Sequence, residues 1–159
     1  GFESGSQQVL DLSKKGITVE QSKQAVKLTK EAGIEVAGSF MFGMYGDTKQ
    51  SIQETIKFAL QLNCDYAQFQ LATPVPSTEF FEKSGGVNKQ SHFEFLRWYK
   101  WKTLDNPSLP YEFLHRKLKQ AYRRFYFRLP YIYRRFRSIR SPRQLLLIIR
   151  TGLYLLIHI

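Results

Sequence analysis

The stretch Thr18–Gly43, TVEQSKQAVKLTKEAGIEVAGSFMFG, predicts a capped helix followed by a buried strand. Thr18 and Gln21 have the spacing of a capping box, in which each side chain bonds the other residue's backbone N–H at the start of a helix. Gly33 would end this helix, since glycine tolerates the left-handed conformation found there. The mostly apolar residues 34–42 then predict a strand that is buried on both faces, as in a parallel sheet.

The same order of helix and strand follows once more along the chain. Asp47 or Thr48 can cap a second helix, and residues 66–72 then form a second apolar strand. Pro74 and Pro76 would end that strand, because proline donates no backbone hydrogen bond. Strands that alternate with helices of this length predict βα units and a parallel sheet. The sequence therefore predicts an α/β fold.

The formal net charge of +11 is concentrated in the second half of the chain. Residues 1–89 hold nine Lys or Arg and ten Asp or Glu, whereas residues 90–159 hold fifteen and three. Such a basic segment indicates an anionic partner, either a phospholipid surface, a nucleic acid or an acidic protein. Cys64, the single cysteine, excludes a disulfide framework within these 159 residues and favours a reducing compartment, the cytoplasm.

Gly85-Gly86 marks a predicted boundary between two segments. Residues 1–85 carry the βα pattern, and residues 86–159 form a basic, aromatic-rich extension with the pattern of helices alone. The helices predicted in this extension span residues 91–104, 111–137 with an interruption at Pro130, and 143–159.

Four short motifs in the first segment have a characteristic order. They are Gly-Phe-Glu-Ser-Gly-Ser at 1–6 with Lys15-Gly16, Ala32-Gly33-Ile34, Gly46-Asp47-Thr48, and Thr73-Pro74-x-Pro76-x-Thr78. In this order and spacing they resemble the back half of the barrel of radical S-adenosylmethionine (SAM) enzymes. The resemblance covers residues 1 to about 82 and is strongest to the branch that carries an upstream cobalamin-binding domain. It implies a partial TIM-like (βα) barrel, formed by the last strands of a radical SAM barrel.

The resemblance also implies an activity and its cofactors. Enzymes of this family cleave SAM reductively to a 5′-deoxyadenosyl radical for C–H activation, which leads to methylation, cyclisation or rearrangement. A 4Fe–4S cluster needs several thiolates, and Cys64 alone cannot hold one, so the cluster ligands are expected in an N-terminal part that is missing here. The 159 residues alone should then be inactive. The resemblance also implies cobalamin and an electron donor protein as partners. A lipid, isoprenoid or tetrapyrrole as the small-molecule substrate would fit the basic extension.

The resemblance implies that the residues at the start of the chain, which correspond to the segment after the fourth barrel strand of the family, bind SAM. Glu3 and Ser4 would contact its ribose or methionine moiety, since a carboxylate offers several acceptor sites to hydroxyls or an ammonium. Lys15 would pair with the SAM carboxylate. The residues alone also allow Glu3 to cap a turn and Lys15 to be a solvated residue ahead of a helix.

Further residues implied to lie near the cofactor come from the next two strand ends. Phe40, Phe42 and Gly43 would pass beside the adenine, although plain core packing explains the two phenylalanines equally well. Thr73 and Pro74 would line the base of the substrate space.

The basic extension has an amphipathic pattern. A stripe at helical spacing is formed by Leu114, Leu118, Tyr122, Phe125, Leu129 and Ile132. The stripe and its surrounding arginines favour peripheral contact of residues 111–159 with the inner face of an anionic membrane. A helical bundle packed on the barrel is the second interpretation, and nucleic-acid binding is the least favoured. For the whole protein, an RNA-modifying radical SAM enzyme or a catalytically dead, membrane-associated scaffold stay open as alternatives.

Overall fold

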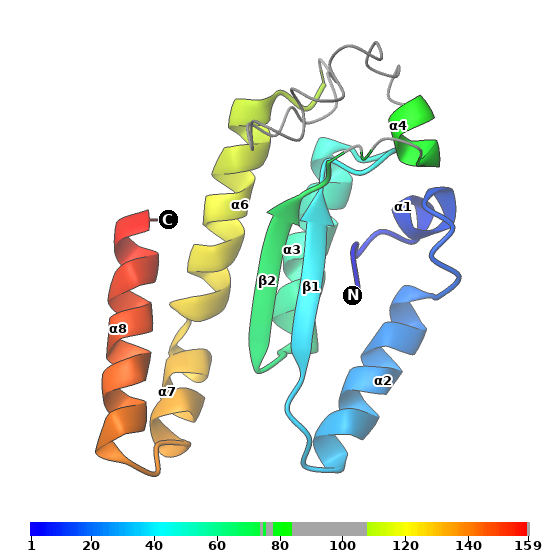
Figure 1. The fold of residues 1–159 in the computed structure, drawn as a ribbon. Coiled ribbons are helices and arrows are strands. Elements are labelled where there is room, and N and C mark those ends of the chain that lie inside the picture. Colours follow the sequence, from blue (N-terminus) through cyan, green and yellow to red (C-terminus); the bar gives the residue numbers. More distant parts are fainter. Residues whose placement is uncertain (74, 76–77, 84–107, 159) are drawn as a thin grey trace.

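The computed structural model describes residues 1–73, 75, 78–83 and 108–158, with side chains up to residue 153. Within them, a small parallel sheet carries helices α3 and α6 on one face (Figure 1). The elements are α1 (Gln7–Leu12), α2 (Val19–Glu31), β1 (Ala37–Phe42), α3 (Lys49–Leu62), β2 (Tyr66–Leu71), α4 (Glu79–Lys83), α6 (Tyr111–Tyr126), α7 (Leu129–Arg137) and α8 (Pro142–His158). The glycine boundary and the helix predicted over 91–104 lie outside the described residues.

The two predicted helix starts are confirmed. Thr18 caps α2 and exchanges hydrogen bonds with Gln21, as a capping box requires. Thr48 caps α3 in the same way with Ser51. Gly33 follows α2 with a φ of 74°, the left-handed conformation that the sequence predicts there.

β1 and β2 pair in parallel, with Phe40 opposite Phe69, so the predicted parallel sheet is confirmed. The chain's first residues run along the other edge of β1. Phe2 N–H and Glu3 N–H both donate to the carbonyl oxygen of Ser39, and Glu3 forms an isolated parallel bridge with Phe40. The order across the sheet is therefore residues 2–3, β1 and β2.

The prediction that the first strand is buried on both faces is wrong for β1. Its side chains alternate, with Phe40 and Phe42 fully buried, Ser39 and Met41 half-buried, and Ala37 exposed. Successive side chains of a strand point to opposite faces, and α3 and α6 cover only one of these faces.

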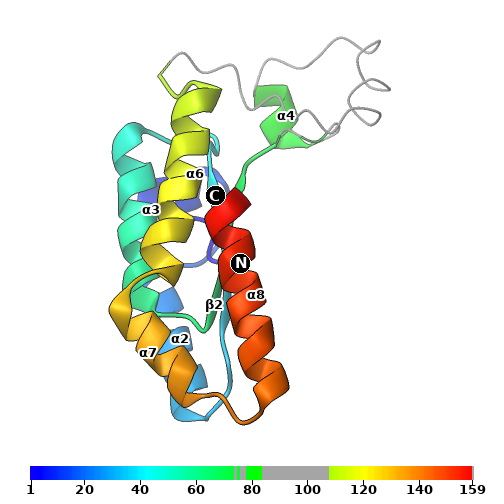
Figure 2. The same cartoon turned by 90° about the vertical axis from the view of Figure 1, so that its left-hand side faces the viewer.

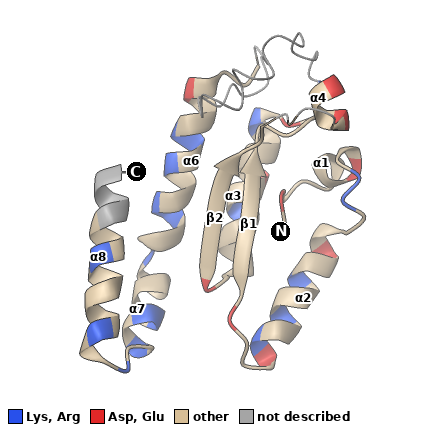
Figure 3. Ribbon diagram, viewed as in Figure 1, with Lys and Arg blue, Asp and Glu red and all other residues tan. Residues whose placement is uncertain are grey.

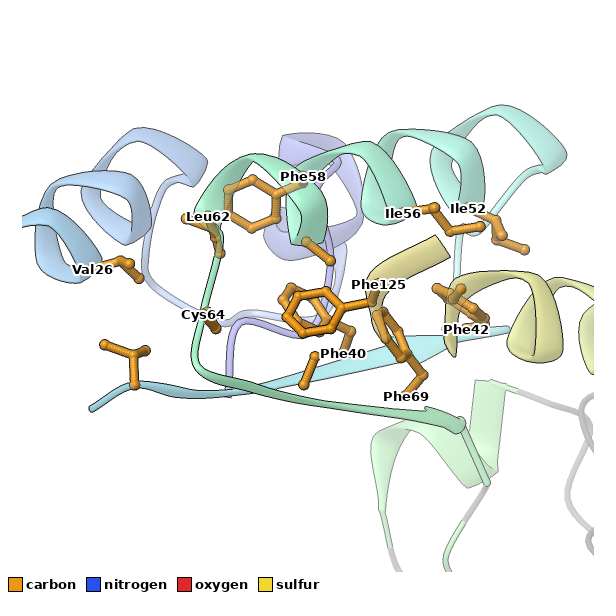
Figure 4. Close-up of a cluster of buried hydrophobic side chains, with 14 of the residues drawn as sticks. Val26, Phe40, Phe42, Ile52, Ile56, Phe58, Leu62, Cys64, Phe69 and Phe125 are labelled. Carbon is orange, nitrogen blue, oxygen red and sulfur yellow. The ribbon is translucent and has the colours of Figure 1, made fainter. Parts of the chain in front are cut away.

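The covered face holds the hydrophobic core (Figure 4). Phe40 and Phe69 stack with ring centroids 5.3 Å apart, and Phe125 of α6 meets Phe69 edge-on at 6.2 Å. From α3, Ile52 and Ile56 are buried against the same cluster, as their spacing predicts. The core therefore joins the βα segment to the extension.

The extension packs on the edge of β2 through tyrosine hydroxyls. Tyr126 Oη donates to the carbonyl oxygen of Ala67 at 2.8 Å and accepts from its N–H at 3.0 Å. Tyr122 Oη does the same for Phe69, at 3.0 Å and 3.2 Å. The two hydroxyls therefore replace a neighbouring strand along this edge.

Arginines of the extension bind the turn between α3 and β2. Arg128 donates to the carbonyl oxygen of Leu60 at 2.8 Å, and Arg134 to that of Cys64 at 3.0 Å. Arg135 lies over the ring of Tyr66, 4.2 Å from its centroid. The last carbonyls of a helix lack partners within the helix, and cations there also complement its dipole. These three arginines are therefore part of the packed structure.

The predicted interruption of the long helix is confirmed, at a shifted position. α6 ends at Tyr126, and Pro130 lies in the first turn of α7, where its missing N–H removes no helical hydrogen bond. Leu129 does not join the buried stripe, because its side chain is 80% exposed. The earlier stripe positions Leu114 and Phe125 are buried.

α8 is the outermost helix, and in two perpendicular views α6 lies between it and α3 (Figures 1 and 2). Within the described part of the chain, no helix has both the length and the apolar character needed to span a bilayer.

Candidate functional site

The candidate site lies where the parallel strands end. Carboxyl ends of neighbouring parallel strands meet at one edge of a sheet, so the turns that follow them share one surface. Three segments contribute here: residues 3–6 beside β1, residues 43–48 after β1, and Thr73 after β2.

Glu3 and Lys15 form the charged part of this surface. Lys15 Nζ lies 3.0 Å from Glu3 Oε1, and the two side chains are only 32% and 16% exposed. The second carboxylate oxygen, Glu3 Oε2, is buried and has no hydrogen-bond partner among the described residues. Glu3 also has a φ of 60°, a conformation that non-glycine residues seldom adopt outside functional sites and tight turns.

Ser4 faces away from this pair, into the structure. Its hydroxyl oxygen lies 3.1 Å from Thr55 Oγ1 of α3 and accepts from Ser6 N–H at 3.1 Å. Gly5 N–H donates to the same threonine oxygen at 3.0 Å. The side chain of Ser4 therefore holds the loop on α3, and it is fully buried.

Gly5 allows that loop to touch the helix. A Cβ atom on Gly5 would lie 2.5 Å from Phe58 Cβ and 2.7 Å from the carbonyl oxygen of Glu54. No side chain fits at those distances, so the position of Glu3 depends on glycine two residues later.

The turn after β1 is built around the carboxylate of Asp47. Asp47 Oδ2 accepts from Gly43 N–H and Met44 N–H, both at 2.9 Å, and Ser51 Oγ donates to Oδ1. Burial raises the pKa of Asp47, and the three hydrogen bonds oppose that shift. Gly43 has a φ of 83°, a left-handed conformation in which a residue with a side chain would be strained.

The remaining predicted residues occupy different surroundings. Phe40 and Phe42 point into the core, so their side chains favour the core-packing interpretation, and only their backbone borders the turn. Thr73 is half-buried at the end of β2. Pro74 lies outside the described residues. The structure thus joins Glu3 with Lys15, and no hydrogen bond or ion pair links them to Gly43 or Thr73 within the described residues.

The uncovered face of the sheet extends the candidate site. Ser39 and Met41 lie on this face, and Gln70 Nε2 donates to Ser39 Oγ at 3.3 Å. Ser39, Met41 and Gln70 are all half-buried. This face of the sheet therefore presents a mixed polar and apolar surface next to the strand ends.

Sequence reasoning missed Thr55. It lies on the apolar side of α3, one residue before Ile56, and its hydroxyl also donates to the carbonyl oxygen of Ser51 at 2.9 Å. A hydroxyl residue inside an apolar stripe is the signal that could have identified it. The left-handed backbone of Glu3 carries no such signal, because its residue type does not favour that conformation.

The surroundings of Cys64, the single cysteine of the sequence, disfavour the thiolate form that binds metals. Cys64 is buried, and burial raises the pKa of its thiol to about 11. Among the described residues, no group of three or more His, Cys, Asp or Glu side chains could hold a metal ion.

Comparison with known families gives this geometry a context. Residues 1–59 match the family model described as Radical SAM superfamily. These residues are therefore similar in sequence to the radical SAM superfamily, and the family model covers less than half of the chain. The match covers the three segments that carry Glu3, Lys15 and Asp47.

Individual relatives match a larger share of this chain than the family model does. An uncharacterized methyltransferase of Pyrococcus horikoshii is 38% identical over 132 residues, which cover 80% of this chain and 28% of the relative. An anaerobic magnesium-protoporphyrin IX monomethyl ester cyclase of Rubrivivax gelatinosus is 34% identical over 98 residues, covering 62% and 17%. A bacteriochlorophyllide d C-12(1)-methyltransferase of Chlorobaculum tepidum is 34% identical over 105 residues, covering 65% and 22%.

Two facts follow from these matches. The chain spans 28% or less of the length of these three relatives. A match over 80% of the chain also extends beyond residue 85, so the first of these relatives shares at least part of the helical extension.

Proposed function

We propose that this chain contributes part of the catalytic barrel of a radical SAM enzyme, in which Glu3 and Lys15 bind the polar end of SAM. The observation that carries the proposal is the buried Glu3 Oε2, which has no partner among the described residues. A buried carboxylate oxygen without a hydrogen bond is unfavourable by roughly 1–3 kcal/mol or more, and a ligand donor would remove that penalty.

The chemistry of SAM fits these two side chains. Its ammonium and ribose hydroxyls are donors, which suit Glu3, and its carboxylate is an acceptor, which suits Lys15. The loop that carries Glu3 is fixed by Ser4, Gly5 and Thr55, and Lys15 Nζ lies 3.0 Å from the Glu3 carboxylate. Backbone atoms of Phe42 and Gly43 are proposed to border the adenine, and Thr73 with Pro74 the substrate space.

A 4Fe–4S cluster does not fit the described residues. Cys64 is a single, buried, protonated thiol, so the cluster ligands would come from other parts of the protein. A cluster held elsewhere would supply the electron for SAM cleavage, and the residues described here would bind and orient SAM. An electron donor protein would be the cluster's source of electrons, and the free thiol is consistent with a cytoplasmic location.

The names of the relatives support a substrate class. Two of them are named for magnesium-protoporphyrin IX monomethyl ester and bacteriochlorophyllide d, and the reactions named are ring closure and methyl transfer. We propose a tetrapyrrole, or a lipid or isoprenoid of similar apolar character, as the substrate. Cobalamin is a further proposed cofactor, supported by the resemblance to the cobalamin-binding branch.

The test uses the full-length protein, reconstituted anaerobically with iron and sulfide. The proposal expects 5′-deoxyadenosine to form when SAM and a reductant are added, and SAM affinity to fall at least about tenfold in Glu3→Gln, since bonds to charged groups are strong. Glu20→Gln is the matched control, because Glu20 is an exposed residue of α2 that pairs with Lys23.

Three results would contradict the proposal. A full-length protein that binds no cluster would be a scaffold. Unchanged SAM affinity in Glu3→Gln would remove Glu3 from the site. Salt-dependent RNA binding together with turnover of RNA would favour the RNA-modifying alternative over a tetrapyrrole substrate.

A further inference from the structure

Helices α7 and α8 expose an apolar surface that nothing among the described residues covers. We infer that this surface docks on an anionic membrane. It consists of Leu129, Tyr133, Phe136, Leu146, Leu147, Ile149 and Leu153, and we call it the outer surface. Their side chains are between 47% and 80% exposed, whereas apolar side chains of this size are usually largely buried. This inference is independent of the proposed SAM chemistry.

The orientation of α7 is fixed by hydrogen bonds to the turn between α3 and β2. Leu129, Tyr133 and Phe136 are spaced by four and three residues, so they form one stripe along the helix. The opposite side of α7 holds Tyr131 and Arg134, which donate to the carbonyl oxygens of Asp65 and Cys64 at 3.2 Å and 3.0 Å. The exposed stripe therefore cannot turn inward without breaking these bonds.

α8 divides its apolar residues between two faces. Leu145 and Ile148 are half-buried, whereas Leu146, Ile149 and Leu153 are exposed. The exposed set is also spaced by three and four residues, so it forms a stripe of its own. The two stripes belong to consecutive helices, which a short turn joins at the lower end of the view in Figure 2.

The charges around the outer surface have one sign. Arg137, Arg140, Arg143 and Arg150 flank it, and Glu112 is the only acidic residue after position 105. Figure 3 shows basic positions along α6, α7 and α8 and an acidic one only at the start of α6. None of the four arginines forms an ion pair with a described residue, in contrast to Arg134 and Arg135.

This combination selects a membrane over other partners. An anionic bilayer offers phosphates to the arginines and apolar acyl chains to the leucines at the same depth. A nucleic acid would neutralise the arginines but leave the aliphatic side chains in water. A second copy of the chain would bury the leucines but bring four arginines against four others, and α7 and α8 carry no acidic residue that could pair with them.

The experiment measures binding of the full-length protein to vesicles of phosphatidylcholine alone and of phosphatidylcholine with 30% phosphatidylglycerol, by co-sedimentation. We expect tight binding only to the anionic vesicles, weakened by 0.5 M salt. The triple variant Arg140→Gln, Arg143→Gln, Arg150→Gln should bind about 100-fold more weakly, given the usual contribution of each basic residue at such a surface. Leu146→Gln with Leu153→Gln should lose at least about tenfold.

The control is Lys23→Gln with Lys27→Gln, which removes two exposed charges from α2 and should leave binding unchanged. The altered side chains are exposed, so equal melting temperatures should confirm that every variant folds. If a variant does not fold, the salt dependence of the wild-type protein still decides the question.

Several outcomes would overturn the inference. They are equal binding to neutral and anionic vesicles, unchanged binding of the arginine variant, or no vesicle binding at all. Concentration-dependent dimers that Leu146→Gln with Leu153→Gln abolishes would identify a second copy as the occupant. RNA binding without vesicle binding would identify a nucleic acid. Neither of these last two results would bear on SAM cleavage, which is measured separately.

Discussion

Replacing Tyr126 by phenylalanine tests whether side-chain hydroxyls take the place of a strand on the edge of β2. The change removes one oxygen and keeps the ring, which meets Phe125 at 5.0 Å and Tyr131 at 5.1 Å between centroids. It leaves the N–H and the carbonyl oxygen of Ala67 without the partner they have at 3.0 Å and 2.8 Å. Packing should therefore be preserved while two hydrogen bonds are lost.

The magnitude follows from those two groups. A buried polar group without a partner is unfavourable by about 1–3 kcal/mol, and water can reach part of this edge, so the lower end applies to each. We expect the free energy of unfolding to fall by about 2 kcal/mol. For a chain of this size, that corresponds to a decrease in melting temperature of roughly 4–8 °C.

The assay is urea denaturation combined with amide hydrogen exchange. Tyr126→Phe should unfold at lower urea with an unchanged slope, and the amide of Ala67 should exchange faster than in the wild-type protein. The matched control is Tyr133→Phe, because Tyr133 is 63% exposed and bonds only Arg137 among the described residues. Its stability should stay within about 0.5 kcal/mol of the wild type. If Tyr126→Phe behaves like this control and the exchange of Ala67 does not change, the reasoning is refuted.

Three further predictions use the same measurements. Gly5→Ala should lower the free energy of unfolding by about 1–3 kcal/mol, because its Cβ would overlap atoms of α3. The control Gly152→Ala has open space around its Cβ and should be neutral or stabilising. Equal urea midpoints for the two variants would contradict this prediction. Asp47→Asn should cost about 1–3 kcal/mol by urea titration, because an amide places a donor among three donors, and an unchanged midpoint would disprove the role of the carboxylate. Burial raises the pKa of Tyr126 to about 12 from its usual value near 10, so its contribution to stability is complete below pH 10 and is lost as the pH rises towards 12. Tyr126→Phe should lack that decline, and an identical pH profile in both proteins would show that another group causes it.

Local patterns predicted much of the fold. The Thr18 and Thr48 caps, both strands and the parallel pairing follow from capping residues and apolar runs, which act over a few residues. The prediction that the first strand is buried on both faces is wrong at Ser39, because burial depends on which faces of the sheet other elements cover. No local sequence pattern indicates which faces of the sheet are covered.

The candidate site was predictable in composition and less so in geometry. The resemblance implied that Glu3 and Lys15 each bind SAM, which stays a prediction, and the structure places their side chains 3.0 Å apart. It did not reveal that Ser4 turns towards Thr55, since that bond joins residues 51 positions apart. The sequence also does not indicate which arginines of the basic extension are packed and which face solvent. Arg128 binds the carbonyl oxygen of Leu60 and Arg143 is exposed, and only long-range packing distinguishes the two.

The tyrosine-bonded edge of β2 has a consequence for biosynthesis. Each of its hydroxyls comes from more than 50 positions later in the chain, so the edge forms before the groups that complete it. During this interval the nascent chain presents open backbone groups beside apolar side chains, the arrangement that recruits strands from other molecules. Between translation of Ala67 and of Tyr126 this edge is therefore exposed to aggregation, and slowing synthesis within that period should lower the soluble yield.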